Sequence, residues 1–443
     1  MKNNTIIRRE LGAFFMLWIT QSLSQLSSSM TSFALVIYLY EKSGSALSTA
    51  LLSVCSYAPY IVLSMFAGAL SDTWNKKRTM LVCDSLAAIS TVVLLVLLHT
   101  DHLQIWHLYA LNVFNGTMNT VQQPASDVAI SLITPRKHYQ KVSGLKSFSN
   151  ALITMLTPII ATSLYAFAGM EAVILVDVST FFAAFLMLWL LIRIPEQVSV
   201  AKAGAKSVFK SAGEGLHYLR QNRGILDLML FLATINLTAS IYNAALPAML
   251  LSRTGGGSTA LGWVSMVTGF ATLLGSLLAS TLGAPKSRVK VIYWSLLFSM
   301  STENFFLAFG RSVPVWCIGA MLGWLAIPLM STNLDVLMRL HIPIEMQGRV
   351  YATRNTLQFC TIPLGYLLGG VLIDKVFEPF AAKHVANVFF DTLFGSGKGS
   401  GAAFLFAVIG CFGVATCLVF GKDQAIWSLE NEKQIDDSLK KTL

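Results

Sequence analysis

The chain carries little charge for its length. Only 12% of its 443 residues are Asp, Glu, Lys or Arg, whereas 54% are hydrophobic, and the mean hydropathy is positive. Soluble domains carry about 25% charged residues, so this composition excludes an ordinary soluble protein. Apolar runs of about 20 residues, the length that crosses a bilayer core, recur along the whole chain. The sequence therefore predicts a polytopic membrane protein embedded in a lipid bilayer.

Groups typical of metal, redox or hydrolytic chemistry are also scarce. The six cysteines fall inside or at the edges of apolar runs without a Cys-x-x-Cys pair, so reduced, packed thiols are expected. His99, His102 and His107 cluster near one predicted loop, but without the spacing of a metal site. No apolar run contains a nucleophile–base pair, a zinc-protease motif or an acid dyad. We expect no metal, no cofactor and no enzymatic activity.

The apolar runs predict an all-α protein with twelve transmembrane helices. The first run, about 12–40, is too long and too interrupted by polar residues for a signal peptide, so it is expected to be retained. The glycine-rich outer segment 374–400 lacks the spacing of a phosphate-binding loop and is expected to be flexible. The twelve spans are centred near residues 28, 58, 89, 118, 155, 182, 239, 271, 299, 327, 361 and 411.

The basic residues predict the orientation of these spans. With the N-terminus inside, 25 of the 32 Lys and Arg residues fall on cytoplasmic segments and six on outer ones. This positive-inside bias predicts that both termini are cytoplasmic. It also accounts for the net charge of +10, so nucleic-acid binding is not needed to explain that charge.

The longest charged interruption divides the spans into two groups of six. We expect an N-terminal bundle over 1–192, a cytoplasmic linker over 193–224, a C-terminal bundle over 225–420 and a cytoplasmic tail over 421–443. Apolar residues recur at helical spacing in the linker, with basic residues on its other faces. This pattern favours an amphipathic helix on the inner membrane surface.

A short charged loop between the second and third spans carries a specific resemblance. Its matching residues are Gly68, Leu70, Asp72, Lys76, Lys77 and Arg78. The loop resembles the signature loop of the major facilitator superfamily, and it departs from that pattern at Thr73 and Asn75. Asn75 is expected to supply the left-handed turn geometry of the missing glycine. The resemblance implies two six-helix bundles and a cytoplasmic gate that latches onto neighbouring helix ends or acids.

Two further stretches narrow the resemblance. Residues 124–145 and 342–350, the latter followed by Pro363-Leu364-Gly365, are similar to segments of the macrolide-efflux-like branch of that superfamily. This similarity implies a drug:proton antiporter. The same branch includes siderophore exporters and lysophospholipid-handling relatives, so the substrate stays open.

Polar side chains recur at helical spacing in spans one, four and seven. Each set lies on one face of its helix, and in this superfamily these helices line the central cavity. The alternative is that these groups hydrogen-bond neighbouring helices. The predicted cavity residues are Gln21, Gln25, Ser28, Asn112, Asn115, Asn119, Gln122, Asn236, Ser240 and Asn243.

Ionisable residues inside the spans are few, and a membrane-buried carboxylate can carry a proton. Asp127, Asp177 and Arg354 are the proton-coupling candidates, while Asp84, Asp127 and Asp335 are close enough to the inner face to pair with loop cations. Arg354 lies within reach of Asp335 or of a helix end.

These observations predict a monomeric exporter in the bacterial cytoplasmic membrane. It would move amphipathic, macrolide-like molecules by alternating access, coupled to protons. The alternatives are a siderophore or lysophospholipid transporter of the same fold and, more remotely, a membrane-embedded enzyme or sensor.

Overall fold

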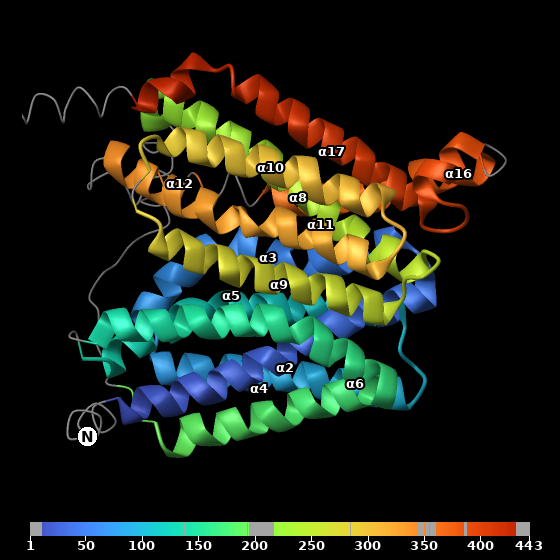
Figure 1. Cartoon of the computed structure of the whole chain (residues 1–443). Coiled ribbons are helices and arrows are strands. Elements are labelled where there is room, and N and C mark those ends of the chain that lie inside the picture. The colour runs from blue at the N-terminus through green and yellow to red at the C-terminus, as the bar shows by residue number, and fades with distance from the viewer. Residues whose placement is uncertain are drawn as a thin grey trace, which may run out of the picture. The chain divides into compact units, whose positions relative to one another are not determined.

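The computed structural model describes residues 11–135, 138–192, 194, 217–283, 285–342, 350, 354, 360–384 and 388–430, although the side chains of 64–73 and a few others lie outside this description. Every long regular element in these ranges is a helix (Figure 1). Seven helical stretches among them are long and apolar enough to cross a membrane. Each of the twelve expected span centres falls within a helix, while the count of twelve spans stays a prediction.

The described residues group into two compact units. Unit 1 comprises Met1–Gly44 and Leu51–Ala205, and unit 2 comprises Ser45–Ala50 and Lys206–Leu443. Most of the predicted linker, 193 and 195–216, lies outside the described residues, as does the tail beyond residue 430. Residues 424–430 form a further short helix, and Ile426 and Leu429 are buried in the core of unit 2.

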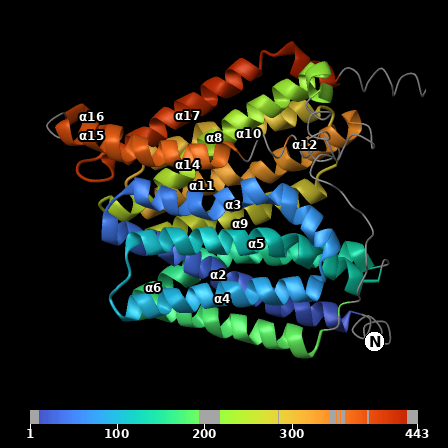
Figure 2. The ribbon, with the colours of Figure 1, turned by 180° about the vertical axis from the view of Figure 1, so that it is seen from behind.

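The described part of unit 1 is built from five helices. Gly44 ends the first of them in the left-handed region (φ 62°) and donates its N–H to Tyr40 O, which closes the last turn. In Figures 1 and 2, α2 and α4 run beside α6, and the buried core between them includes Met30, Ala34 and Leu94. The helices are α2 (Gly12–Ser43), α3 (Ala46–Thr73), α4 (Lys76–His99), α5 (Ile105–Ile133) and α6 (Tyr139–Leu190).

Helix α6 contains two predicted spans joined without a loop. Gly169 has φ 75° and ψ −177°, a conformation that L side chains rarely adopt, and it breaks the helix. The first arm has Ser149 hydrogen-bonded to Ser22 of α2. The second arm returns along α2, because Asp177 meets Ser28 before Leu188 packs near Leu17.

Asn75 departs from its predicted conformation. Its φ of −65° and ψ of 115° are extended, and its Oδ1 accepts the N–H of Arg78 at 2.9 Å. The expected left-handed turn is therefore wrong. Asn75 instead caps the N-terminus of α4, a position that asparagine favours for its side-chain acceptor.

The described residues of unit 2 form more helices than those of unit 1, and several of them are short. Its core joins Leu228, Met229, Leu296 and Leu337, which come from three different helices. Asp374 accepts hydrogen bonds from Ala46 N and Leu47 N, both at 3.0 Å, so the first turn of α3 groups with this unit. The elements are α8 (Arg223–Ser252), α9 (Ser258–Thr281), α10 (Arg288–Phe309), α11 (Val313–Leu325), α12 (Ile327–His341), α14 (Thr361–Val371), the π-helix η2 (Leu372–Phe377), α15 (Glu378–Lys383), α16 (Val388–Phe394) and α17 (Ser400–Phe420).

The segment 374–400 is not the flexible loop that its glycines predict. It contains η2, α15 and α16, and the rings of Phe390 and Phe394 pack on Phe404 of α17. Arg253 donates to the carbonyl of Phe394 at 2.9 Å, and Arg311 donates to carbonyls of the same helix. Aromatic packing and these two guanidinium groups give the described part of the segment its order.

Candidate functional site

The polar stripe of α2 lies on a face that is partly accessible. Gln25 and Ser28 are exposed, and Gln21 is half-buried. Farther along the same face, Ser32 is exposed as well. Next to this stripe, the indole Nε1 of Trp18 is a buried donor with no acceptor among the described residues. The face therefore offers amide and hydroxyl groups without formal charge.

Asp177 of α6 joins this face from the side. Its carboxylate accepts hydrogen bonds from Ser28 Oγ at 2.8 Å and from Ser27 Oγ at 3.1 Å. The residue is only 5% exposed, and within the described residues no cation pairs with it. A carboxyl held by neutral hydroxyls in a membrane span is free to exchange a proton without breaking an ion pair.

Asp84 of α4 forms the second carboxyl site of unit 1. Gln21 donates to its Oδ2 at 3.4 Å, and Gln122 of α5 donates to its Oδ1. Asp84 was expected to pair with a loop cation, and this is wrong, because its described partners are the two amides. The signal was present in the sequence, since both glutamines already lay on the predicted stripes of spans one and four.

The stripe of α5 divides between two environments. Asn115 accepts a hydrogen bond from Ser90 of α4 at 2.6 Å, and Asn112 donates to the carbonyl of Leu108 in its own helix. Asn119 is exposed. Part of the predicted cavity set therefore connects helices, which is the alternative that the periodicity left open.

The stripe of α8 in unit 2 is similarly mixed. Ser240 is buried and donates to Asn236 O at 2.8 Å, while Asn243 is exposed and Asn236 half-buried. A methyl group added to Gly365 of α14 would lie 2.4 Å from Ser240 Cβ, so α14 covers Ser240 closely.

The other two coupling candidates form ion pairs. Asp127 binds Lys146 of α6, and both side chains are about half exposed. Arg354 donates to Asp335 at 3.4 Å, the partner that the sequence placed within its reach. Ion pairs that are at least partly exposed, as these two are, contribute little to stability.

The charged loop after α3 is described only in part. Gly68, Leu70 and Asp72 lie outside the described side chains. Lys76 Nζ donates to Trp74 O at 2.8 Å, and Arg78 is exposed. Lys77 Nζ donates to Trp189 O at 3.0 Å and to Ile192 O at 2.7 Å, at the end of α6. A cation at a helix C-terminus satisfies its free carbonyls and complements its dipole.

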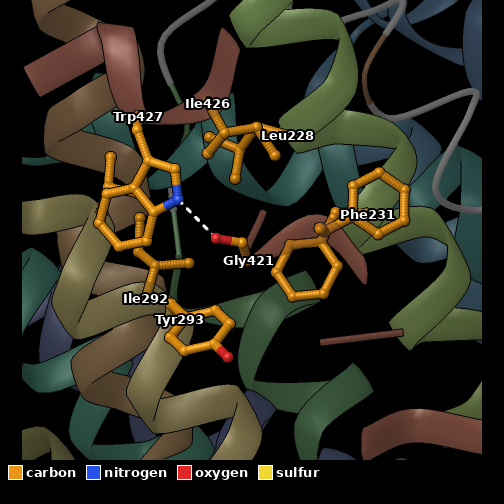
Figure 3. Close-up of a pocket in the computed structure, with 9 residues that line it drawn as sticks. Leu228, Phe231, Ile292, Tyr293, Gly421, Ile426 and Trp427 are labelled. Carbon is orange, nitrogen blue, oxygen red and sulfur yellow. Dashed lines mark hydrogen bonds between the residues drawn. The ribbon is translucent and has the colours of Figure 1, made fainter. Parts of the chain in front are cut away.

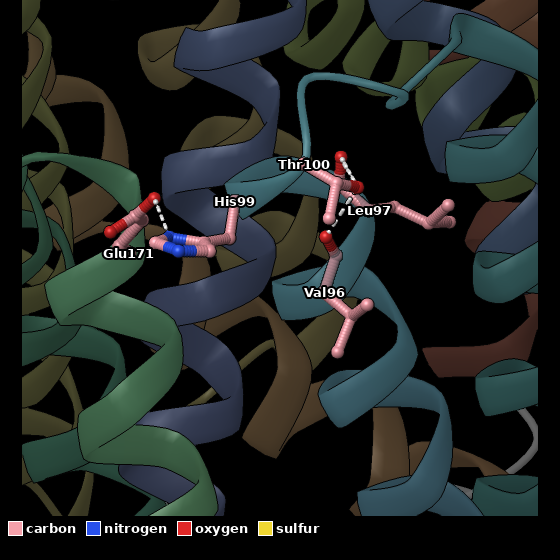
Figure 4. A network of polar contacts seen from close by, with 5 residues as sticks. All are labelled: Val96, Leu97, His99, Thr100 and Glu171. Atoms are coloured by element: carbon pink, nitrogen blue, oxygen red, sulfur yellow. Dashed lines mark hydrogen bonds and ion pairs between the residues drawn. The ribbon is translucent and has the colours of Figure 1, made fainter.

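The three clustered histidines have separate partners. Figure 4 shows His99 turned toward Glu171 of α6, with Nδ1 3.4 Å from the carboxylate. His102 contacts Thr100 O, and His107 Nδ1 accepts the N–H of Gln104. Among the described side chains, no group of three His, Cys, Asp or Glu could hold a metal ion.

A small apolar pocket lies in unit 2, next to the start of the tail (Figure 3). Trp427 closes one side of it and donates its indole N–H to Gly421 O at 2.7 Å. Phe231 and Tyr293 form other walls. The lining offers few polar groups, so we assign it to packing between the tail and the helix ends.

Comparison with known proteins places the chain in a family. The model of the Major Facilitator Superfamily matches residues 17–239. The chain is 24% identical to macrolide efflux protein A of Streptococcus pyogenes over 82% of its length and 90% of the relative's. It is 23% identical to macrolide efflux protein A of Enterococcus faecalis, over 71% of this chain and 97% of that protein. These matches confirm the resemblance to the macrolide-efflux-like branch.

Solved structures agree on the fold. A mutant of the nucleoside transporter NupG superposes with a TM-score of 0.68 at 12% identity, over 93% of this chain and all of the other. A bacterial homologue of the iron transporter ferroportin, in its inward-facing state, gives 0.66 at 14% identity, over 93% and 99%. At such identities the likeness shows the fold alone. Since the family model also covers half of the sequence, the chain is a multi-pass bacterial membrane protein that belongs to the Major Facilitator Superfamily of transporters.

Proposed function

We propose that this transporter exports amphipathic, macrolide-like compounds in exchange for protons, by alternating access, and so contributes to antibiotic resistance. The names of its relatives support the substrate class. The uncharged polar face of α2 supports it as well, because amides and hydroxyls on an apolar wall suit a bulky amphiphile. A phosphorylated or dicarboxylate substrate would require convergent arginines, and the helical stretches of α2, α5 and α8 that carry the stripes have none.

Asp177 carries the proposal for coupling. It is buried, held by the hydroxyls of Ser27 and Ser28, and adjacent to the exposed stripe of α2. A proton on Asp177 would neutralise the site, and its loss would leave a carboxylate beside the substrate face. Proton and substrate would then compete through the shared residue Ser28. Asp127 and Arg354 would serve in ion pairs that change partner during the cycle.

We place the charged loop at the cytoplasmic gate of a monomeric protein with both termini inside. Lys77 would release the carbonyls at the end of α6 when the gate opens, and Asp72 with Arg78 would complete the latch. The carbonyl contacts of Lys77 support this role.

Transport by Asp177→Asn tests the proposal. Cells lacking their main pumps would be loaded with a macrolide, with and without a protonophore. Wild-type protein is expected to lower macrolide accumulation, and the protonophore to abolish the difference. Asp177→Asn is expected to lose at least tenfold of the protonophore-sensitive export, because its side chain cannot ionise.

Glu171→Gln is the matched control, since Glu171 lies on the same helix but is exposed and contacts His99. Equal loss in both variants, at equal expression, would contradict the role of Asp177. A response to a siderophore or a lysophospholipid alone would assign the transporter to that substrate instead.

A further inference from the structure

A third buried carboxyl lies in unit 2, on a helix that carries none of the predicted stripes. Glu303 of α10 is 5% exposed. Tyr242 of α8 donates its hydroxyl to Glu303 Oε1, and Trp324 of α11 donates its indole N–H to the same oxygen at 2.7 Å. Three helices thus meet at one carboxyl group, with the phenol and indole rings 6.5 Å apart.

The two oxygens of this carboxyl are not equivalent. Both donors converge on Oε1, whereas Oε2 receives no hydrogen bond from a described residue. This arrangement fits a neutral carboxyl group, in which Oε1 would be the carbonyl acceptor and Oε2 would carry the proton. In an ionised carboxylate the negative charge is shared by both oxygens, so donors on both oxygens would stabilise it better.

Neighbouring helices pack closely on the carboxyl. A methyl group added at Gly323 of α11 would lie 2.5 Å from Glu303 Cβ and 2.7 Å from Oε2. The backbone of α11 therefore closes over the carboxyl, and on the other side Phe406 packs edge-on against Tyr242. A drug or metal ion would have to displace this packing.

No cation compensates the site within the described residues. On the elements packed against α10, the titratable group that meets Glu303 is the phenol of Tyr242. Arg253 binds the carbonyls of Leu307 and Ala308, about one turn farther along α10. Arg288 pairs with Asn333 of α12 at the opposite end of α10. The side of α17 that faces α10 presents Gly410 to Asn304 and is neutral.

We propose that Glu303, together with Tyr242 and Trp324, is a second proton-binding site of this transporter, enclosed in unit 2. The proton leaves Oε2 during the transport cycle, and the resulting carboxylate keeps its two donors. The proton passes to water beside Trp324, a partly exposed residue in contact with the carboxyl. This inference rests on the proposed proton antiport and extends it to one carboxyl in each unit.

Infrared spectroscopy of the purified full-length protein in lipid vesicles tests the site without any substrate. A protonated carboxyl has a carbonyl band separate from the amide bands. Spectra of the wild type, Glu303→Gln and Asp177→Asn would be compared across the neutral pH range. A protonated-carboxyl band that disappears at high pH, is absent from Glu303→Gln and persists in Asp177→Asn would support the site.

Two milder variants test the hydrogen bonds to Oε1 and keep the test valid if Glu303→Gln fails to fold. Tyr242→Phe and Trp324→Phe each remove one donor from Oε1, so the band is expected to move to higher frequency without disappearing. Glu303→Gln is also expected to lose at least tenfold of the proton-driven transport in vesicles.

A Glu303→Gln spectrum identical to the wild type, or a band unmoved in both donor variants, would overturn the proposal. So would a band that is present at every pH together with full proton-driven transport by Glu303→Gln. Failure of macrolide export alone would leave the infrared result intact, and would count against the proposed substrate only.

Discussion

At the scale of single residues, Arg253 is a buried cation of unit 2. It is 8% exposed, donates to the carbonyls of Leu307, Ala308 and Phe394, and lies over the ring of Trp316. Arg253→Gln is expected to lower the free energy of unfolding by about 2–4 kcal/mol, because buried carbonyls lose a charged donor. Thermal unfolding in detergent measures this change.

The control variant Arg311→Gln removes an exposed arginine and is expected to lower the free energy of unfolding by under about 1 kcal/mol. An equal loss of unfolding free energy in both variants would contradict the larger contribution that we assign to the buried Arg253.

Residue type predicted the buried acids better than it predicted their partners. Asp177 was a candidate because acids are rare in membrane spans. Helical spacing placed Gln21 and Gln122 on stripes, but it could not show that both amides reach Asp84 rather than a cavity. Such a meeting depends on the rotation of three helices about their axes, which a single-helix periodicity leaves undetermined.

At the scale of elements, α8 and α14 form a close helix contact within unit 2. Gly365 and Gly369 face Ser240 and Ala244, a small-residue interface that brings the backbones together. Gly365→Leu is expected to destabilise unit 2 by about 1–3 kcal/mol or more, because its side chain would overlap Ser240. Leu364→Phe, on the exposed side of α14, is the control. A melting temperature equally unaffected in both variants would contradict this interface.

Helix positions followed from the apolar runs, whereas helix ends and connections did not. The expected centres at 155 and 182 both lie in α6, yet a joint at one residue, Gly169, could not be read from hydropathy. The segment 374–400 was misjudged for a related reason. Its glycines favour flexibility, but order there comes from contacts with Arg253 and Phe309, which are distant in the sequence.

At the scale of the whole molecule, charge predicts the orientation in the membrane. Because 25 of the 32 basic residues fall on one set of segments, both termini are expected in the cytoplasm. Green fluorescent protein fused after residue 443 is expected to fluoresce, and alkaline phosphatase fused after residue 398 to be active. If the fluorescent fusion were dark and the phosphatase fusion inactive, the assigned orientation would be wrong and the charged loop would lie on the outer face.

The joint at Gly169 also has a mechanical consequence. One residue joins the two arms of α6, so the ends of the arms stay close together when either arm is displaced. Tyr165 near the tip of the first arm holds Glu41 at 2.6 Å, and Asp177 lies just beyond the joint on the second arm. A displacement of the end of α2 at Glu41 would therefore also move the carboxyl that we assign to proton exchange.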